Sequence, residues 1–264
     1  MPRFFVEQEI VSEADHIVLN SDDSHHIVNV LRLRPGEKIE VCDSHHTLFL
    51  CAMPDRVSVD RRALVVPILS RRPADTEPPY KAVLYQGLPK GDKFSDIVRT
   101  CVELGVFRIV PVICERSVAR PDPGKIDARV RRWNSVAVAA AKQCGRSLLP
   151  SVERALTFEA ALADFAAARD DQTLAFVPYE AEDSVSLRHF LENGERKKQF
   201  AVPPRRICFF VGPEGGFSAA EIDQFRELGF STVTLGPRIL RTETAGSAAL
   251  AMLGYKFEQD WSII

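Results

Sequence analysis

The chain has 264 residues, of which 45% are hydrophobic and 27% are charged. This composition can bury a sizeable core and excludes a predominantly disordered chain. No stretch of about eighteen apolar residues occurs, and Glu7 and Glu9 come too early for a secretory signal, so we expect a cytoplasmic protein. The six cysteines form no Cys-x-x-Cys pair, and we expect no metal site.

The net charge of −2 hides an uneven distribution of charge along the chain. Residues 81–146 carry 13 Lys/Arg against 6 Asp/Glu, a net charge of +7. Residues 1–75 carry 9 against 12, and residues 147–264 carry 12 against 17. A basic block of this kind is typical of a surface that binds a polyanion, although a solvated helix face would have the same composition.

Residues 1–70 have the pattern of a small β-rich module. Short apolar runs occupy residues 17–19, 39–42, 48–51, 57–59 and 64–69, and turn residues such as Pro35-Gly36 separate them. One helical stretch is predicted at residues 24–31. We therefore predict a half-buried barrel or sandwich, followed by a linker at residues 71–79, which hold three prolines and four charges.

From Tyr80 onward, strands and helices alternate. The helix signals include Gly105 as a C-cap and a capping box from Ser218 to Glu221. The alternation predicts a parallel sheet with helices on both faces, and domain boundaries at residues 1–72 and 77–264. Strands are predicted at residues 81–86, 107–114, 173–177, 206–211 and 232–235, and helices at 91–104, 125–143, 218–228 and 242–256.

Two glycine-bearing loops follow predicted strands, at the edge where open α/β sheets bind ligands. The first is Gly212-Pro213-Glu214-Gly215-Gly216, and the second begins Leu235-Gly236-Pro237. Neither has the spacing of a Rossmann or Walker motif. The first loop alone could be a structural turn. The second contains Arg238, Arg241 and Glu243 within six residues, beside an apolar helix, which favours a site over packing.

The sequence resembles the RsmE-type 16S ribosomal RNA uridine-N3 methyltransferases of the SPOUT superfamily over nearly its whole length. Four stretches carry the resemblance, at residues 90–105, 139–146, 211–217 and 235–245. Pro2-Arg3-Phe4-Phe5 and residues 26–36 resemble the PUA-like RNA-binding module of that family. The Gly-Pro-Glu-Gly loop occurs more widely among related RNA methyltransferases, so it supports the superfamily rather than the substrate.

The resemblance implies a fold, a cofactor and partners. The fold is an α/β SPOUT-type parallel sheet with a C-terminal trefoil knot, preceded by a small PUA-like β-barrel domain. General rules of chain connectivity would have argued against a knot. The implied cofactor is S-adenosyl-L-methionine, and the implied partners are a second copy of the chain and 16S ribosomal RNA of the small ribosomal subunit. The last helix is apolar almost all round, so it must be buried on more than one side, which agrees with a homodimer.

Methylation at uridine N3 requires loss of the N3 proton, stabilisation of charge on O2 and O4, and an in-line methyl group. The catalytic candidates are Arg241, Glu243 and Arg146, with Glu214 as an alternative proton acceptor. The cofactor-binding candidates are Val177, Pro178, Glu180, Gly212, Pro213, Glu214, Gly215, Leu235, Gly236, Ile239, Leu240, Thr244 and Ala245. The RNA-binding candidates are Arg3, Arg32, Arg34, Arg129, Arg132, Lys142 and Arg238.

Simpler interpretations of these residues stay open. Arg146 could cap the preceding helix, Glu243 could interact with the dipole of the last helix, and Tyr85-Gln86 could merely end a strand. Two other functions are also open. One is a non-catalytic RNA-binding or ribosome-assembly protein, against which the intact loop at residues 235–245 argues. The other is a SPOUT methyltransferase acting on another RNA, and the stretch Gln143-Cys144-Gly145-Arg146 favours 16S RNA instead.

Overall fold

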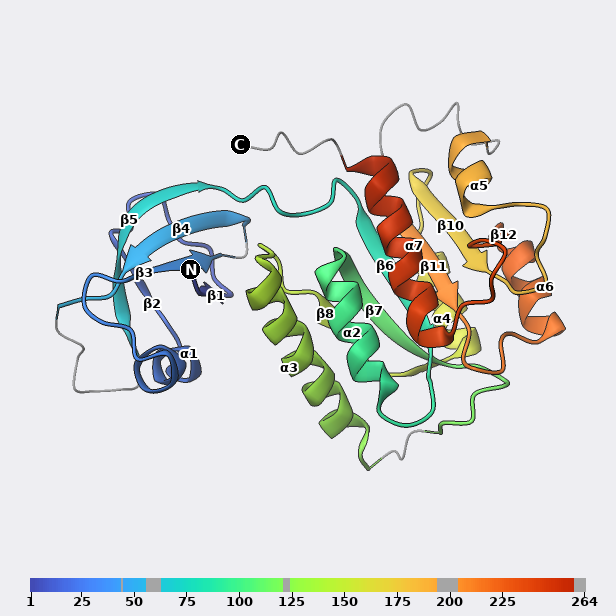
Figure 1. Cartoon of the computed structure of the whole chain (residues 1–264), viewed down its shortest axis with the longest axis horizontal. Coiled ribbons are helices and arrows are strands. Elements are labelled where there is room, and N and C mark those ends of the chain that lie inside the picture. Colours follow the sequence, from blue (N-terminus) through green and yellow to red (C-terminus); the bar gives the residue numbers. More distant parts are fainter. Residues whose placement is uncertain (44, 56–62, 121–123, 194–203, 259–264) are drawn as a thin grey trace. The chain divides into compact units, whose positions relative to one another are not determined.

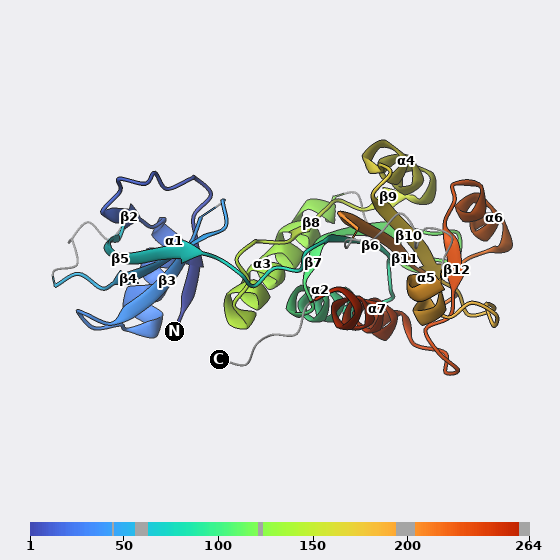
Figure 2. The same ribbon diagram turned by 90° about the horizontal axis from the view of Figure 1, so that it is seen from above.

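The computed structural model describes residues 1–43, 45–55, 63–120, 124–193 and 204–258, and these form two compact units (Figures 1 and 2). The N-terminal unit comprises residues 1–77 together with 141–149, and the C-terminal unit comprises residues 78–140 and the chain from 150 onward. The strand predicted at residues 57–59 lies outside the described residues. None of the described helices is long and apolar enough to cross a membrane.

The N-terminal unit is built on a five-stranded sheet with the order β1-β3-β4-β5-β2. The β1 strand is parallel to β3, and the other neighbours are antiparallel. Alternate apolar residues such as Ile39 and Val41 turn inward to one core, which also takes Phe4 from β1. The elements are β1 (Arg3–Phe5), β2 (His16–Val18), α1 (Ser21–His25), the π-helical stretch η1 (His26–Leu31), β3 (Lys38–Cys42), β4 (Thr47–Ala52) and β5 (Val65–Pro73).

The predicted linker at residues 71–79 begins too early. The β5 strand continues to Pro73, and its last residues pair with β4, Arg71 opposite Phe49. The guanidinium of Arg71 lies 5.6 Å from the centre of the Phe49 ring and donates to the carbonyl oxygen of Ala14. The charges and the proline suggested a linker, but both are compatible with the end of a strand. Exposed strand positions accept charged residues such as Arg71, and a proline is tolerated where a strand ends.

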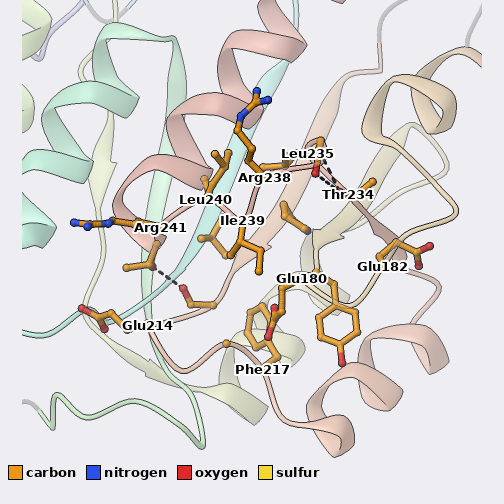
Figure 3. A pocket seen from close by; sticks show the side chains of 18 of the residues that line it. Glu180, Glu182, Glu214, Phe217, Thr234, Leu235, Arg238, Ile239, Leu240 and Arg241 are labelled. Atoms are coloured by element: carbon orange, nitrogen blue, oxygen red, sulfur yellow. Dashed lines mark hydrogen bonds between the residues drawn. The ribbon is translucent and has the colours of Figure 1, made fainter.

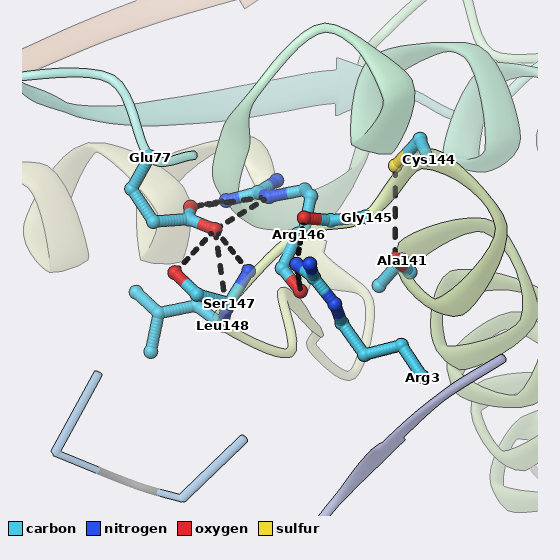
Figure 4. A network of polar contacts seen from close by, with 8 residues as sticks. All are labelled: Arg3, Glu77, Ala141, Cys144, Gly145, Arg146, Ser147 and Leu148. Atoms are coloured by element: carbon cyan, nitrogen blue, oxygen red, sulfur yellow. Dashed lines mark hydrogen bonds and ion pairs between the residues drawn. The ribbon is translucent and has the colours of Figure 1, made fainter. Parts of the chain in front are cut away.

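A buried polar network joins Glu77 to the turn at residues 145–148, and both belong to the N-terminal unit (Figure 4). The Arg146 guanidinium pairs with Glu77 at 2.5 Å, and the N–H groups of Ser147 and Leu148 donate to the same carboxylate. Arg3 pairs with Glu40 at 2.7 Å and donates to the carbonyl oxygens of Gly145 and Arg146. Burial alone would raise the pKa of Glu77, but these donors bring it below its ordinary value.

The C-terminal unit is built on a parallel sheet with the strand order β12-β10-β11-β6-β7-β8, and β9 also pairs with β7. All the pairings are parallel, as predicted. Since the strands run in one direction, the segments that leave β10, β11 and β12 emerge at the same edge. The strands are β6 (Lys81–Gly87), β7 (Val106–Ile113), β8 (Ser151–Val152), β9 (Leu156–Thr157), β10 (Thr173–Pro178), β11 (Arg206–Val211) and β12 (Ser231–Val233).

Helices cover both faces of this sheet, also as predicted (Figure 2). Val83 and Tyr85 of β6 join an aromatic-rich core with Phe158 of α4 and Phe225 of α6. On the opposite face, Gly246 of α7 packs closely on Leu84. The helices are α2 (Lys93–Glu103), α3 (Ile126–Cys144), α4 (Phe158–Ala168), α5 (Leu187–Asn193), α6 (Ala219–Glu227) and α7 (Thr242–Phe257).

The helix predictions succeeded where a cap was recognised. Ser218 and Glu221 form the predicted capping box, and α6 follows it. The sequence analysis missed α4, whose N-cap Thr157 accepts the N–H of Ala160. It also missed α5, which has only seven residues.

Candidate functional site

A pocket of about 920 Å³ opens at the edge of the sheet where β10, β11 and β12 end (Figure 3). Three segments of the chain form most of its wall, at residues 178–186, 211–217 and 234–241. The first turn of α7 and the side chain of Lys93 complete it. The site therefore lies where the parallel strand order brings segments together that are distant in the sequence.

Glycines permit the close approach of these segments. A Cβ atom on Gly87, at the end of β6, would lie 2.5 Å from the backbone nitrogen of Pro213. Gly216 has a positive φ of 66°, and a Cβ there would lie 2.3 Å from a carboxylate oxygen of Glu180. The loop turns back through a hydrogen bond from the N–H of Gly216 to the carbonyl oxygen of Pro213. Backbone rather than side chains therefore forms this wall of the pocket.

A chain of buried hydrogen bonds fixes the two glycine-bearing loops to the central strand. The Gln86 amide donates to the Thr242 hydroxyl at 2.9 Å, and that hydroxyl donates to the carbonyl oxygen of Gly212 at 2.6 Å. Gln86 is completely buried. The simpler interpretation, that Gln86 merely ends a strand, is therefore incomplete, because its side chain also holds the start of α7. Its signal in the sequence was an amide at an inward position of an otherwise apolar strand.

Charged side chains gather where the pocket meets α2 and α7. The Lys93 ammonium lies 3.3 Å from Glu214 and 3.4 Å from Glu243, and an Arg241 nitrogen lies 3.9 Å from the same Glu243 oxygen. The carboxylate of Glu214 also accepts the N–H of Lys90. Burial opposes ionisation of Glu214, but its own N–H, the Lys90 N–H and Lys93 outweigh this and lower its pKa. The hydrogen bond from Lys93 to Glu214 raises the pKa of the lysine.

A second acidic group fixes the segment that leaves β10. Glu182 accepts the hydroxyls of Ser184 and Thr232 and the N–H groups of Ser184 and Val185. These donors lower the pKa of Glu182 to about 2. Its carboxylate is therefore occupied in holding this segment to β12, which nothing in the local sequence indicated.

The structure places most of the predicted cofactor-binding residues in the pocket wall. Val177 is an exception, because it is buried in the core between the sheet and α4, and Thr244 is not part of the wall either. Several lining residues were not predicted from the sequence, among them Lys93, Glu182, Phe217 and Thr242. The predicted residues that line the pocket are Pro178, Glu180, Gly212, Pro213, Glu214, Gly215, Leu235, Gly236, Ile239, Leu240 and Ala245.

Of the predicted catalytic residues, Arg241 and Glu243 line the pocket together. Arg146 does not line it, because its guanidinium is buried against Glu77 in the N-terminal unit. Arg238 lines the pocket, but its side chain points away from that of Arg241 (Figure 3).

The predicted RNA-binding residues fall into two groups. Arg3 is buried against Glu40, and Lys142 pairs with Asp23 at 2.5 Å and lies over the Phe4 ring. The other group is exposed, and in it Arg132 pairs with Asp92. Its members are Arg32, Arg34, Arg129, Arg132 and Arg238.

Comparison with known proteins agrees with this architecture. Residues 76–254 match the RNA methyltransferase domain family, and residues 19–53 match the RNA methyltransferase PUA domain family. The ribosomal RNA small subunit methyltransferase E of Bacillus subtilis is 31% identical over 263 residues, with 98% of each chain covered. The protein of the same name from Synechocystis is 30% identical, covering 97% of this chain and 78% of its own.

Solved structures show the same likeness. A ribosomal RNA small subunit methyltransferase E from Neisseria gonorrhoeae bound to S-adenosyl methionine has a TM-score of 0.78 at 31% identity, covering 97% of this chain and 98% of its own. A putative methyltransferase from Legionella pneumophila, in complex with the same cofactor, has a TM-score of 0.77 at 27% identity, with 96% of each chain covered. The chain therefore belongs to the RNA methyltransferase family, in the group named ribosomal RNA small subunit methyltransferase E. The family resemblance of the sequence is confirmed, and the knot stays a prediction.

Proposed function

We propose that this chain transfers a methyl group from S-adenosylmethionine to N3 of a uridine in 16S ribosomal RNA of the small ribosomal subunit. The observation that carries the proposal is the pocket itself, in which three strand-end segments meet the pair Arg241 and Glu243. The relative from Neisseria gonorrhoeae, with its bound cofactor, supports it. A substrate of this kind occurs in the cytoplasm, where we also place the protein.

The pocket fits S-adenosylmethionine in charge and in shape. Five acidic and three basic side chains line it, an excess that suits a ligand with a sulfonium and an ammonium group. Leu235, Ile239 and Leu240 provide apolar surface, and the Gly212 loop offers backbone groups at close range. When bound, the cofactor supplies a methyl group made electrophilic by its sulfonium sulfur.

Glu243 is the better candidate for the proton acceptor. The carboxylate of Glu214 already accepts a backbone N–H and the Lys93 ammonium, and its lowered pKa makes it a weak base. Among the described residues, Glu243 accepts no backbone N–H, and its contacts are to Lys93 at 3.4 Å and to Arg241 at 3.9 Å. We therefore propose that Glu243 accepts the N3 proton, and that Glu214 positions Lys93.

Arg241 suits the stabilisation of negative charge. Its side chain is 83% exposed, whereas its carbonyl oxygen accepts the N–H groups of Thr244 and Ala245 at the start of α7. The backbone is thus fixed while the guanidinium reaches out to a substrate. Once N3 has lost its proton, the charge spreads over O2 and O4 of the uracil, where a guanidinium is an effective partner.

We propose that the exposed arginines of α3 contact RNA phosphates. One side of α3 is buried through Trp133 and Ala137, and Arg129, Arg131 and Arg132 lie on the exposed side. In the N-terminal unit, Arg32 and Arg34 are also exposed. Arg3 and Lys142 contribute less, because neighbouring carboxylates already neutralise them.

We also propose that two copies of the chain associate through α7. Thr242, Ala249 and Leu253 belong to its buried side, whereas Met252 is 38% exposed and Tyr255 is 94% exposed on the other. Apolar residues on this second side need cover from another molecule.

Sedimentation at micromolar concentration should show a dimer, and a monomer would contradict this.

The proposed function predicts a defined product and a defined defect. Wild-type protein, labelled S-adenosylmethionine and small subunits from a strain that lacks the modification should yield 3-methyluridine after digestion to nucleosides.

Arg241→Ala should lower the rate at least about tenfold, because it removes a cation at the developing charge. Its melting temperature should hardly change, since the side chain is exposed. Another methylated nucleoside, or a fully active Arg241→Ala protein, would contradict the assignment.

The cofactor site predicts that Gly87 cannot carry a side chain. The Cβ of Gly87→Ala would collide with the backbone at Gly212 and Pro213, so the loop must shift. We expect affinity for S-adenosylmethionine, measured by calorimetry, to fall at least about tenfold. Gly254→Ala is the matched control, because Gly254, like Gly87, does not have a positive φ, does not line the pocket, and would bring its Cβ only against the flexible carboxylate of Glu258. If both variants bind the cofactor like wild type, the Gly212 loop does not form the site.

The RNA surface predicts a change in salt dependence. The double reversal Arg129→Glu and Arg131→Glu should weaken binding to small subunits and flatten the plot of log K against log salt by about 0.7 per lost contact. Affinity for S-adenosylmethionine should not change. The double reversal Arg188→Glu and Arg226→Glu, at exposed positions of α5 and α6, is the charge-matched control. Filter binding across a salt series decides, and an unchanged slope would leave the N-terminal unit as the RNA surface.

A further inference from the structure

Lys93 is a charged group of the pocket that is not among the site residues predicted from the sequence. It begins α2, and its ammonium contacts carboxylates from two other segments, Glu214 after β11 and Glu243 at the start of α7. Glu214 is itself fixed by the N–H of Lys90, just before this helix. The ammonium is therefore held in place, although its side chain is 42% exposed.

Lys93, Glu243 and Arg241 form a charge row, in which the carboxylate contacts both cations. Both cations contact the same oxygen of Glu243, Oε1, at 3.4 Å from Lys93 and 3.9 Å from Arg241. The second oxygen, Oε2, is buried and has no hydrogen-bond partner among the described residues. Since Oε2 is buried, Oε1 is the oxygen that a molecule in the pocket can reach, and both cations contact it.

This order of charges matches one edge of one base. Uracil presents an acceptor, a donor and an acceptor in sequence, namely O4, N3–H and O2. A cation, a carboxylate and a cation offer the complementary donor, acceptor and donor. Cytosine would place an amino donor against a cation and the N3 lone pair against the carboxylate, which leaves both pairs repulsive.

We propose that Lys93 is a specificity-determining residue, and that the row Lys93, Glu243 and Arg241 selects uracil and stabilises it after deprotonation. The inference rests on the proposed function and adds the groups that read the base. The N3–H bond breaks, its proton passes to Oε1 of Glu243, and the electron pair remains on the ring, where it spreads to O2 and O4 beside the two cations. N3 then forms the bond to the methyl carbon, as the electron pair of the carbon–sulfur bond returns to sulfur.

The test compares Lys93→Met, Lys93→Arg and the control Arg99→Gln, an exposed arginine farther along the same helix. Methyl transfer to unmodified small subunits should fall at least about tenfold in kcat for Lys93→Met, with cofactor affinity within about threefold of wild type. Lys93→Arg should recover most of the rate, because it restores the cation. Arg99→Gln should behave like wild type.

A second readout addresses the choice of base directly. Subunits carrying either the target uridine or a cytidine in its place compete for the enzyme in the presence of S-adenosylhomocysteine. The preference for uridine should shrink at least about fivefold in Lys93→Met and stay unchanged in Arg99→Gln. A purely structural role for Lys93 would not move this ratio.

The outcomes separate the two claims. A wild-type product other than 3-methyluridine would overturn the proposed function and this inference with it. If the wild type makes 3-methyluridine, the proposed function holds. Lys93→Met with wild-type kcat, or with an unchanged preference for uridine, would then overturn the inference alone.

Discussion

The hydroxyl of Thr242 is the contact on which the site depends. It accepts from the amide of Gln86 on the central strand and donates to the carbonyl oxygen of Gly212. Gln86 and Thr242 are buried, and a buried polar group left without a partner costs about 1–3 kcal/mol. The chain therefore gains stability only when the loop after β11 and the start of α7 both lie against β6.

The chemistry of the site follows from that constraint. Thr242 begins α7, so fixing its hydroxyl also fixes the neighbours Arg241 and Glu243 at the mouth of the pocket. Fixing Gly212 holds Glu214, whose carboxylate holds Lys93. Short polar contacts thus connect the wall that would hold the cofactor to the charges that would act on the base. Since these contacts belong to the fold, the charges are in place before a substrate arrives.

Elements that a short stretch of sequence specifies could be predicted. Contacts between residues far apart in the sequence could not. Alternating strands and helices, the Ser218 capping box and two glycine-bearing loops were enough to predict the parallel sheet and the edge that carries the pocket. Nothing near Lys93 indicates that Glu243, 150 residues later, would face it. Likewise, the basic stretch around Arg146 suggested an anion site, whereas the structure pairs Arg146 with Glu77. Such pairings depend on tertiary packing, which local patterns do not encode.

A titration of S-adenosylmethionine into Thr242→Val and Thr242→Ser proteins shows whether the Thr242 hydroxyl holds the cofactor site together. Valine keeps the volume of threonine but removes the hydroxyl. The Gly212 carbonyl and one N–H of Gln86 then lose this partner, while the Gln86 amide keeps its hydrogen bond to the Gly87 carbonyl. We expect Thr242→Val to lose at least about tenfold in affinity for the cofactor, and Thr242→Ser to stay within about threefold of wild type. A Thr242→Val protein that binds the cofactor as tightly as the wild type would show that the site does not depend on this hydroxyl.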